Sequence, residues 1–267
     1  MPTSLKEILL ATRKAVAARR QSGDRAELEF RAGKRVPRGF RRALAGAAEA
    51  GVAVIAELKK ASPSQGLLRG NFPVGRLAAE LEQAGAAALS VLTEETYFRG
   101  SLADLAEASA ATHLPCLRKD FIVDEFQLLE ARACGADAVL LIVAALAPAQ
   151  LAPLLARSRE LELDVLCEVH DARELQVALA AGCDMIGVNN RDLQTFQVDL
   201  GTALRLGPRI PAPALRVAES GIQSAQDIQK LRDAGFHAFL IGESLMRAES
   251  PGEALKKLLA GVAARTR

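Results

Sequence analysis

The stretch EFQLLEARACGADAVLLIV, residues 125–143, contains one complete structural unit. It opens with apolar residues at helical spacing and reaches a Cys-Gly pair, which is typical of a helix C-terminus. It then continues as a short apolar run that charged residues do not interrupt. Such a run is typical of a strand that is buried on both faces of a parallel sheet. The stretch therefore predicts a helix followed by a buried parallel strand.

The same unit recurs along the chain. Successive apolar runs start roughly 20 to 35 residues apart, and alanine- and leucine-rich helical stretches separate them, so the strands must be parallel and joined by crossovers. Eight such units predict a closed (β/α)8 TIM barrel. An open doubly wound sheet is the alternative, but the Gly-rich fingerprint expected after its first strand is missing. The eight runs are residues 52–58, 88–94, 115–121, 138–143, 164–169, 185–190, 215–220 and 238–243.

Neither a linker nor a composition break divides the 267 residues, so residues 1–267 are predicted to form one barrel domain. Residues 1–51 precede the first strand and are predicted as an N-terminal helical extension. A net charge of +2 gives no electrostatic reason to expect nucleic acid or an acidic membrane as a partner. The chain lacks a membrane-spanning apolar stretch and a signal-peptide pattern, which predicts a soluble cytoplasmic protein.

Four cysteines occur in or beside apolar runs, and none forms a CxxC pair. They are predicted to be buried free thiols, because the spacing of a metal site is absent. The three histidines are interpreted as ordinary loop residues for the same reason. No metal site is expected. The histidines are His113, His170 and His237.

Ionisable and amide side chains collect at the ends of the predicted strands, where barrel enzymes carry their chemistry. Side chains alternate between the two faces of a strand, so Lys59 is predicted to face the lumen and Lys60 the outer helices. Buried charges are costly unless paired, so a salt-bridge network that caps the core is one interpretation. Close charges also shift each other's pKa values, which suits acid–base catalysis. The lumen-facing candidates are Glu57, Lys59, Lys119, Glu168 and Asn189.

Two later strands run into turns that contain a small residue and a glycine, in ESGIQSAQDI (219–228) and GESLMRAES (242–250). The loops after the seventh and eighth strands of a barrel often bind phosphate through backbone N–H groups and a helix N-terminus. Ser220, Gly221, Gly242 and Glu243 are therefore candidates for a phosphate site. Two phenylalanines that follow the second and third strands, Phe98 and Phe121, are either ordinary packing or an apolar wall for an aromatic substrate.

Six motifs carry a resemblance to the indole-3-glycerol phosphate synthase family of the tryptophan pathway, in order from about residue 52 to residue 247. The first and third are the most specific, whereas VAESGI also occurs in other phosphate-binding barrels. The motifs are IAELKKASPSQG (55–66), LTEETYFRGS (92–101), LRKDFIVDEFQ (117–127), GVNNRDLQTF (187–196), VAESGI (217–222) and FLIGESLM (239–246).

The resemblance implies a small phosphorylated aromatic substrate, 1-(2-carboxyphenylamino)-1-deoxyribulose 5-phosphate, and a lyase that closes the indole ring with loss of CO₂ and water. It implies no metal or organic cofactor. It implies Lys119 as the general acid for ring closure and Glu168 as the general base for dehydration, with Lys59 assisting by charge. Association with other enzymes of the tryptophan pathway is left open.

The resemblance also implies roles for the remaining candidates. Glu57 and Asn189 would orient the lysines and the ribulose hydroxyls, and Ser62 and Arg191 would hold the carboxylate end. Phe98 and Phe121 would lie beside the anthranilate ring, and the backbone around Ser220, Gly221, Gly242 and Glu243 would bind phosphate. Many family members have Ser where Glu243 stands, and a glutamate side chain beside phosphate is unfavourable unless it turns away.

Two other functions are alternatives to this one. A phosphoribosylanthranilate isomerase would carry a cysteine at the end of the first strand and an aspartate at the end of the sixth. Here these strands end in Glu57–Lys59 and Asn189, which argues against it. A non-catalytic barrel that only binds a phosphorylated ligand is disfavoured because the ring of charges is complete.

Overall fold

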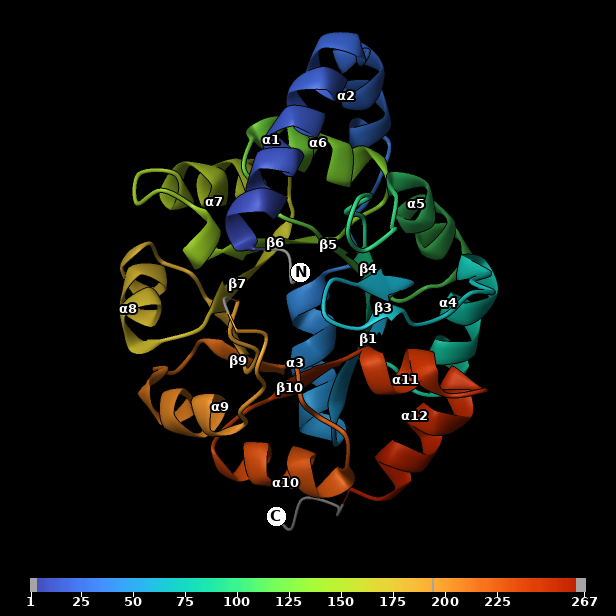
Figure 1. Ribbon diagram of the computed structural model, residues 1–267, viewed down its shortest axis with the longest axis vertical. Helices are drawn as coiled ribbons and strands as arrows, with labels where there is room; N and C mark the ends of the chain where they lie inside the picture. Colours follow the sequence, from blue (N-terminus) through green and yellow to red (C-terminus); the bar gives the residue numbers. More distant parts are fainter. Residues whose placement is uncertain (1–3, 194, 263–267) are drawn as a thin grey trace.

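The computed structural model describes residues 4–193 and 195–262, and in it the eight predicted strands close into a barrel (Figure 1). Each neighbouring pair is parallel, in the order β1-β10-β9-β8-β7-β6-β5-β4, so the barrel prediction is confirmed. The strands are β1 Ala53–Leu58, β4 Ala88–Leu92, β5 Cys116–Lys119, β6 Ala138–Ile142, β7 Asp164–Val169, β8 Met185–Asn189, β9 Leu215–Glu219 and β10 Ala238–Ile241.

A ring of helices surrounds the barrel (Figure 1). Their apolar residues recur at helical spacing, as in α4, where Val74, Leu77, Ala78 and Leu81 are buried on one face. The helices are α4 Val74–Gln83, α5 Leu102–Ala111, α6 Glu125–Ala133, α7 Leu151–Glu160, α8 Ala172–Ala180, α9 Gly201–Leu206, α10 Ala225–Asp233, α11 Glu243–Arg247 and α12 Pro251–Ala260, with 3₁₀ turns η1 Val143–Ala145 and η2 Gly207–Arg209.

Alternation along the strands divides the core into two clusters. In β1, Ala53 and Ile55 pack in the lumen, whereas Val54, Ala56 and Leu58 pack beneath the outer helices. A strand places successive side chains on opposite faces, so Glu57 faces the lumen, as Ala53 and Ile55 do. The strand thus delivers an acid to the C-terminal mouth of the barrel while its other face stays apolar.

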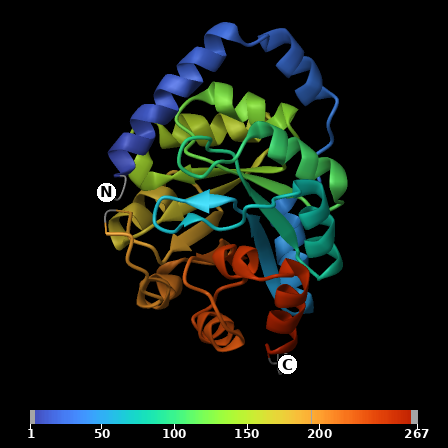
Figure 2. The same ribbon diagram turned by 45° about the vertical axis from the view of Figure 1, so that its right-hand side comes forward.

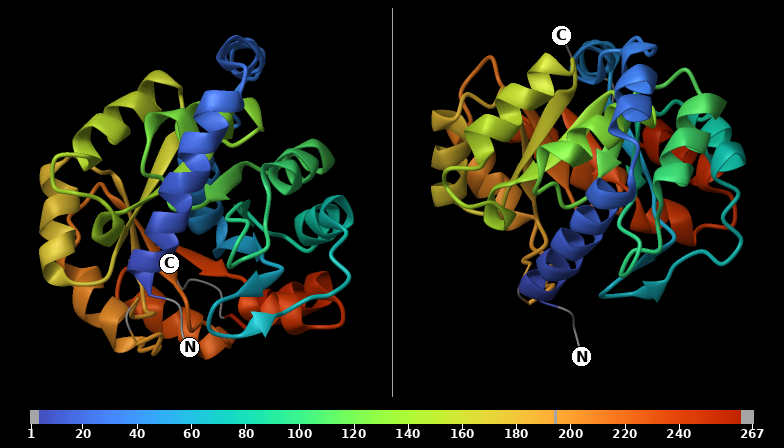
Figure 3. Two further views of the ribbon diagram at one scale, coloured as in Figure 1. Left: turned by 45° about the horizontal axis from the view of Figure 1, so that its top comes forward. Right: turned by 90° about the horizontal axis from the view of Figure 1, so that it is seen from above.

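Residues 4–51 of the predicted extension form α1 Leu5–Ser22, α2 Arg25–Gly33 and α3 Phe40–Ala50. Helix α3 closes the N-terminal end of the barrel, because Phe40 and Leu44 are fully buried in the lumen cluster. Helix α1 crosses the opposite end, where Ile8 joins the same cluster (Figure 3). Figure 2 shows α1 and α2 forming an arch over one side of the barrel. Both ends of the lumen are therefore covered by the extension.

The long loop after β1 contains a hairpin, β2 Ala61–Ser62 and β3 Gly66–Leu67, that the sequence did not lead us to expect. Arg69 anchors the end of this loop, because its guanidinium donates to the main-chain carbonyls of Met246, Ala248 and Glu249. The hairpin is therefore tied to the end of α11.

The cysteine prediction is confirmed, since all four side chains are free and buried. The four are Cys116, Cys134, Cys167 and Cys183. Within residues 4–193 and 195–262, no helix combines the length and apolar character needed to cross a membrane.

Candidate active site

A pocket of about 590 Å³ occupies the C-terminal mouth of the barrel. Helix α1 contributes Leu5 and Ile8 to its wall, and the hairpin after β1 contributes its tip, Pro63 to Gln65. Every site residue named from the sequence lines this single pocket, although the residues come from seven different segments of the chain. They are Glu57, Lys59, Ser62, Phe98, Lys119, Phe121, Glu168, Asn189, Arg191, Ser220, Gly221, Gly242 and Glu243.

The end of β1 supplies an ion pair. Lys59 Nζ lies 2.6 Å from Glu57 Oε1, and only 4% of the Glu57 side chain is exposed. Burial alone would raise the pKa of Glu57, but Lys59 and Lys119 outweigh it and lower that pKa. Gly242 makes the packing possible, because a Cβ at this position would lie 2.5 Å from Glu57 Oε1. Glu57 is therefore a fixed carboxylate beneath Lys59.

Lys119, at the end of β5, lies between two glutamates. Its Nζ is 3.3 Å from Glu168 Oε2 and 3.7 Å from Glu219 Oε2. Burial would lower the pKa of Lys119, but the charges of Glu168, Glu219 and Glu57 outweigh it and raise that pKa. In turn, burial would raise the pKa of Glu168, while Lys119 and His170 hold it well below its usual range. The site thus holds a permanent ammonium group beside an ionised carboxylate.

Glu219 also belongs to this cluster, although the sequence placed it only at a strand end and assigned it no role. It is the last residue of β9, and it shares its parity with Leu215 and Val217, which pack in the lumen. Gly187 leaves room for its carboxylate, since a Cβ there would collide with Glu219 Oε1. Burial first, and the nearby charge of Glu168 second, raise the pKa of Glu219 to about 8. The parity of the run LRVAE was the sequence signal that could have found it.

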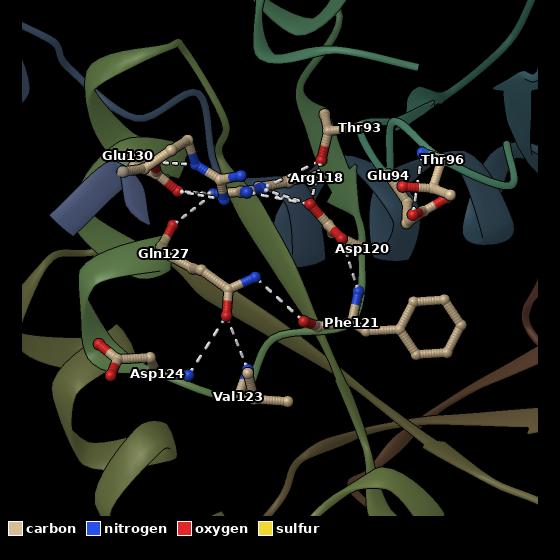
Figure 4. A network of polar contacts seen from close by, with 11 residues as sticks. Thr93, Glu94, Thr96, Arg118, Asp120, Phe121, Val123, Asp124, Gln127 and Glu130 are labelled. Carbon is tan, nitrogen blue, oxygen red and sulfur yellow. Dashed lines mark hydrogen bonds and ion pairs between the residues drawn. The ribbon is translucent and has the colours of Figure 1, made fainter. Parts of the chain in front are cut away.

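Behind Lys119, a buried network fixes β5 from its outer face (Figure 4). Arg118 is only 1% exposed, and it donates to Thr93, Asp120, the Gln127 carbonyl and Glu130. A second donor to Glu130 is Arg19 of α1, at 2.7 Å. Because charge-assisted bonds of this kind are strong and directional, the network ties β5, α6 and α1 together. The ammonium of Lys119 therefore stands on a strand with a rigid support.

Two aromatic rings form one wall of the pocket. The centroids of Phe98 and Phe121 are 6.3 Å apart and their planes are tilted by 45°. Glu94 holds the loop that carries Phe98, since its carboxylate accepts the backbone N–H groups of Thr96, Tyr97 and Phe98. The sequence assigned no role to Glu94. The available signal was its position as an acid at the start of a loop, where its carboxylate can accept backbone N–H groups that lack a partner in regular secondary structure. The wall is placed to receive a flat apolar ring.

The opposite end of the pocket is built from backbone turns. Ser220 and Gly221 both have left-handed φ angles, 64° and 79°, directly after β9. At the N-terminus of α10, a capping box of Ser224 and Asp227 pairs the backbone N–H group of each residue with the side chain of the other. Ser220, Gly221, Gly242 and Glu243, whose backbone N–H groups are the candidates for binding phosphate, line the pocket at these turns, whereas the N–H of Gln223 already donates to Asp227.

Glu243 stands at this end, and its side chain turns to two arginines. Its Oε2 is 3.3 Å from Arg191 Nη2, and its Oε1 is 3.5 Å from Arg247 Nε. The hairpin tip meets the same arginines, because Ser64 lies 3.5 Å from Arg191 and Gln65 lies 2.7 Å from Arg247. The carboxylate is thus neutralised by cations, which removes the electrostatic objection to a glutamate at this position.

Two neutral polar groups complete the pocket. Ser62 is nearly buried, and its hydroxyl has no hydrogen-bond partner among the described residues. Asn189 ends β8, and its Oδ1 accepts the backbone N–H of Arg191 at 3.0 Å. Its side chain also contributes to the low pKa of Glu168. Ser62 therefore has its hydrogen-bonding capacity free for a ligand, while Asn189 is oriented by its own strand end.

His170 lies in the bend after β7, as expected from the sequence, but it also contacts two carboxylates. Its side chain is only 13% exposed, and its two ring nitrogens face Glu168 and Glu174. Burial would lower its pKa, but the two carboxylates outweigh this and raise the pKa of His170 to about 10. The signal in the sequence was its parity, because residues 166, 168 and 170 share one face of β7 and its continuation. His113, by contrast, is fully exposed, as an ordinary loop histidine would be.

A closed (β/α)8 barrel with paired ionisable groups at its C-terminal mouth belongs to the class of barrel enzymes that act on small molecules. Among the described residues, no group of three or more His, Cys, Asp or Glu side chains is placed to hold a metal ion. The model of the family described as indole-3-glycerol phosphate synthase matches residues 5–258. The chain belongs to the indole-3-glycerol phosphate synthase family, which confirms the resemblance carried by the motifs.

Individual relatives agree with the family model. A protein of Koribacter versatilis (strain Ellin345) named indole-3-glycerol phosphate synthase is 58% identical over 259 residues, which cover 97% of this chain and 100% of that one. A protein of the same name from Bordetella pertussis (strain Tohama I) is 50% identical over 258 residues, 96% of this chain and 98% of that one.

Solved structures support the fold. A 3-hexulose-6-phosphate synthase superposes with a TM-score of 0.63 at 15% identity, over 79% of this chain and 100% of that one. A thiamine phosphate pyrophosphorylase from Pyrococcus furiosus gives a TM-score of 0.59 at 16% identity, over 79% of this chain and 95% of that one. At these identities the likeness shows the barrel alone.

Proposed function

We propose that the chain converts 1-(2-carboxyphenylamino)-1-deoxyribulose 5-phosphate into indole-3-glycerol phosphate, with Lys119 as general acid and Glu168 as general base. The observation that carries the proposal is the position of Lys119, held 3.3 Å from Glu168 at the mouth of a barrel of this family. The enzyme class is a carbon–carbon lyase that releases CO₂, in the biosynthesis of tryptophan.

Ring closure requires a proton donor. The ring carbon that bears the carboxylate attacks the ribulose carbonyl carbon, and negative charge develops on the carbonyl oxygen. A fixed ammonium group stabilises that charge more in the transition state than in the ground state. The raised pKa keeps Lys119 protonated, and the network behind β5 fixes its strand. Lys119 therefore suits donation to the carbonyl oxygen.

Decarboxylation and dehydration follow. Loss of CO₂ returns its bonding electrons to the ring and restores aromaticity. The new hydroxyl then leaves as water, and a proton is removed from the neighbouring carbon. Glu168 suits that removal because its low pKa keeps it ionised. Lys59, 2.6 Å from Glu57, would assist the departing hydroxyl by charge and proton donation.

Binding is divided along the pocket. The aromatic wall of Phe98 and Phe121 would take the anthranilate ring, and Ser62 and Arg191 would hold its carboxylate. Glu57 and Asn189 would orient the lysines and the ribulose hydroxyls. The phosphate would bind the backbone N–H groups around Ser220, Gly221, Gly242 and Glu243, whose left-handed turn and short helix start expose such donors.

The proposal includes a small phosphorylated aromatic substrate and neither a cofactor, a nucleic acid nor a membrane as partner. A cytoplasmic location is part of it, and the four free buried thiols support a reducing compartment. We also infer that residues 1–51 belong to the same domain as the barrel, since α1 lines the pocket and α3 closes the lumen.

Formation of the indole product from the substrate, followed by fluorescence, tests the proposal. We expect steady turnover by the purified chain and a loss of at least about a hundredfold in kcat for Lys119→Ala, the scale of general acid–base contributions. Absence of product at high enzyme concentration would contradict the assigned reaction. Near-normal turnover by Lys119→Ala would remove the assigned acid while leaving the reaction in place.

A further inference from the structure

We propose that His170 and Glu174 are positioning residues for Glu168, which they hold as an oriented carboxylate for the dehydration step. The proposal rests on the general-base role assigned to Glu168 above. It arises from a histidine with a 13%-exposed side chain that lies outside the pocket and that the reaction scheme does not use.

The geometry around the imidazole is a chain of three side chains. Glu174 Oε2 lies at hydrogen-bond distance from His170 Nδ1, 3.0 Å. His170 Nε2 lies 3.3 Å from Glu168 Oε1, an ion-pair distance without hydrogen-bond geometry. The same Glu174 oxygen also accepts the backbone N–H of His170 at 2.8 Å. The Glu174 carboxylate therefore contacts both the main chain and the ring of His170, and these two contacts set the direction in which Nε2 points.

Helix α8 explains why Glu174 stands there. Asp171 is the N-cap, and its carboxylate accepts the backbone N–H groups of Arg173 and Glu174. The first turn of α8 is therefore rigid, and Glu174 projects from it back toward the end of β7. A capping arrangement of this kind needs no histidine, so helix capping alone leaves the second ring nitrogen unexplained.

Both ring nitrogens face carboxylate oxygens, and an ionised carboxylate only accepts hydrogen bonds. These contacts therefore favour the imidazolium form of His170, in which both nitrogens carry a proton. Burial of the ring opposes this charge, but the two carboxylates raise the pKa of His170 to about 10. The charged groups that face the ring are Glu168 from β7 and Glu174 from α8, and both favour the charged form.

Glu168 is consequently held from two sides. His170 occupies the side of Oε1, and Lys119 Nζ lies 3.3 Å from Oε2. Two cations keep the carboxylate ionised, as a base must be, and they fix the plane of the group. A misplaced catalytic group can cost on the order of a hundredfold in rate, so the support matters for chemistry and not only for folding. Without His170, Glu168 keeps its interactions with Lys119, Asn189 and Glu219.

Two substitutions test the contributions of the two ring nitrogens separately. His170→Asn places its amide near the former Nδ1 and keeps a partner for Glu174, but it leaves Glu168 Oε1 without a donor. His170→Gln reaches the former Nε2 position and keeps a neutral donor for Glu168. A role in positioning Glu168 predicts that Gln is the milder change, whereas a role in capping α8 predicts that Asn is. His113→Asn is the matched control, because that side chain is fully exposed.

Single-turnover kinetics that resolve ring closure from dehydration test the proposal. We expect His170→Asn to slow dehydration by about ten- to a hundredfold, with ring closure and KM changed less than about twofold. We expect His170→Gln and Glu174→Gln to lose less, and His113→Asn to match the wild type. In a Glu168→Gln background, His170→Asn should cause no further loss, because the group that it positions is gone.

Several outcomes would overturn the inference. They are unchanged dehydration in His170→Asn, equal losses in both chemical steps, or an equal further loss in the Glu168→Gln background. If His170→Asn does not fold, the dehydration rates of His170→Gln and Glu174→Gln are compared with that of the wild type. Normal dehydration in both variants then overturns the inference. Normal dehydration in Glu168→Gln would instead remove the assigned base and this inference with it. The two failures are therefore distinguishable.

Discussion

The adjacent lysines after β1 give a sharp test, because strand parity separates them. Lys59 Nζ lies in the pocket, 2.6 Å from Glu57. Lys60 does not line the pocket. It lies near Asp104 of α5, on the outside of the barrel. Burial raises the pKa of Asp104, and the charge of Lys60 partly offsets that rise. We expect Lys59→Ala to reduce kcat by about a hundredfold, whereas Lys60→Ala should stay within about threefold of wild type.

The magnitude follows from the charges. A hundredfold loss is about 2.7 kcal/mol of transition-state stabilisation, which is the scale of one missing acid–base or electrostatic contribution. Lys59→Ala also leaves the 4%-exposed Glu57 with less compensation, since only the more distant Lys119 still offsets its charge. Loss of one partner of a buried polar pair costs about 1–3 kcal/mol. We therefore expect a measurable but tolerable decrease in the free energy of unfolding.

The assay is fluorescence detection of indole product at saturating substrate, with urea unfolding of each variant measured in parallel. The unfolding data show that both variants are folded at the assay temperature, so that kcat reports chemistry. Equal losses in the two variants, or a Lys59→Ala enzyme within about threefold of wild type, would refute the assignment of faces and the role of Lys59.

Three further predictions concern buried acids and their partners. Glu219 has a pKa raised to about 8, so its stabilising effect is fully present below its ordinary value and is lost as the pH rises through 8. Urea unfolding should therefore show that Glu219→Gln gains about 2–3 kcal/mol more over wild type at pH 9 than at pH 6, and equal gains would contradict this. Arg118→Met should lower the free energy of unfolding by about 3–5 kcal/mol, while Arg20→Met, which breaks an exposed pair, should cost less than about 1 kcal/mol. Glu94→Ala should raise KM several-fold, because the loop that carries Phe98 loses its anchor. Glu95→Ala, at an exposed position, is the control. An unchanged KM in Glu94→Ala would contradict the role of the aromatic wall in binding substrate.

Strand parity accounts for how much of the site was predictable. The runs around Glu57 and Glu168 are apolar on both sides of the charge, and Lys119 shares its strand face with the apolar Leu117. Period two and the barrel rule together therefore place the three charges at one mouth. The same rule applied to Glu219 and His170 would have found both. Neither was assigned a role. Glu219 lies beside a glycine turn that indicated a phosphate site, and His170 lies past the apparent end of its strand.

Other features could not be read from local pattern. The hairpin after β1 has strands of two residues, too short for any periodicity to show. The position of α1 across the mouth depends on long-range contacts, such as Arg19 with Glu130 and Ile8 with the lumen cluster. Local sequence predicts that a helix forms, but the surface on which it packs is set by residues more than a hundred positions away.

The roles of Lys119 and Glu168 are tested most directly by single-turnover kinetics on the substrate, with ring closure and dehydration observed separately. The account predicts that Lys119→Ala slows ring closure by at least about a hundredfold, and that Glu168→Gln passes ring closure at a normal rate and accumulates the undehydrated intermediate. Ring closure at the wild-type rate in Lys119→Ala, or dehydration at the wild-type rate in Glu168→Gln, would contradict it.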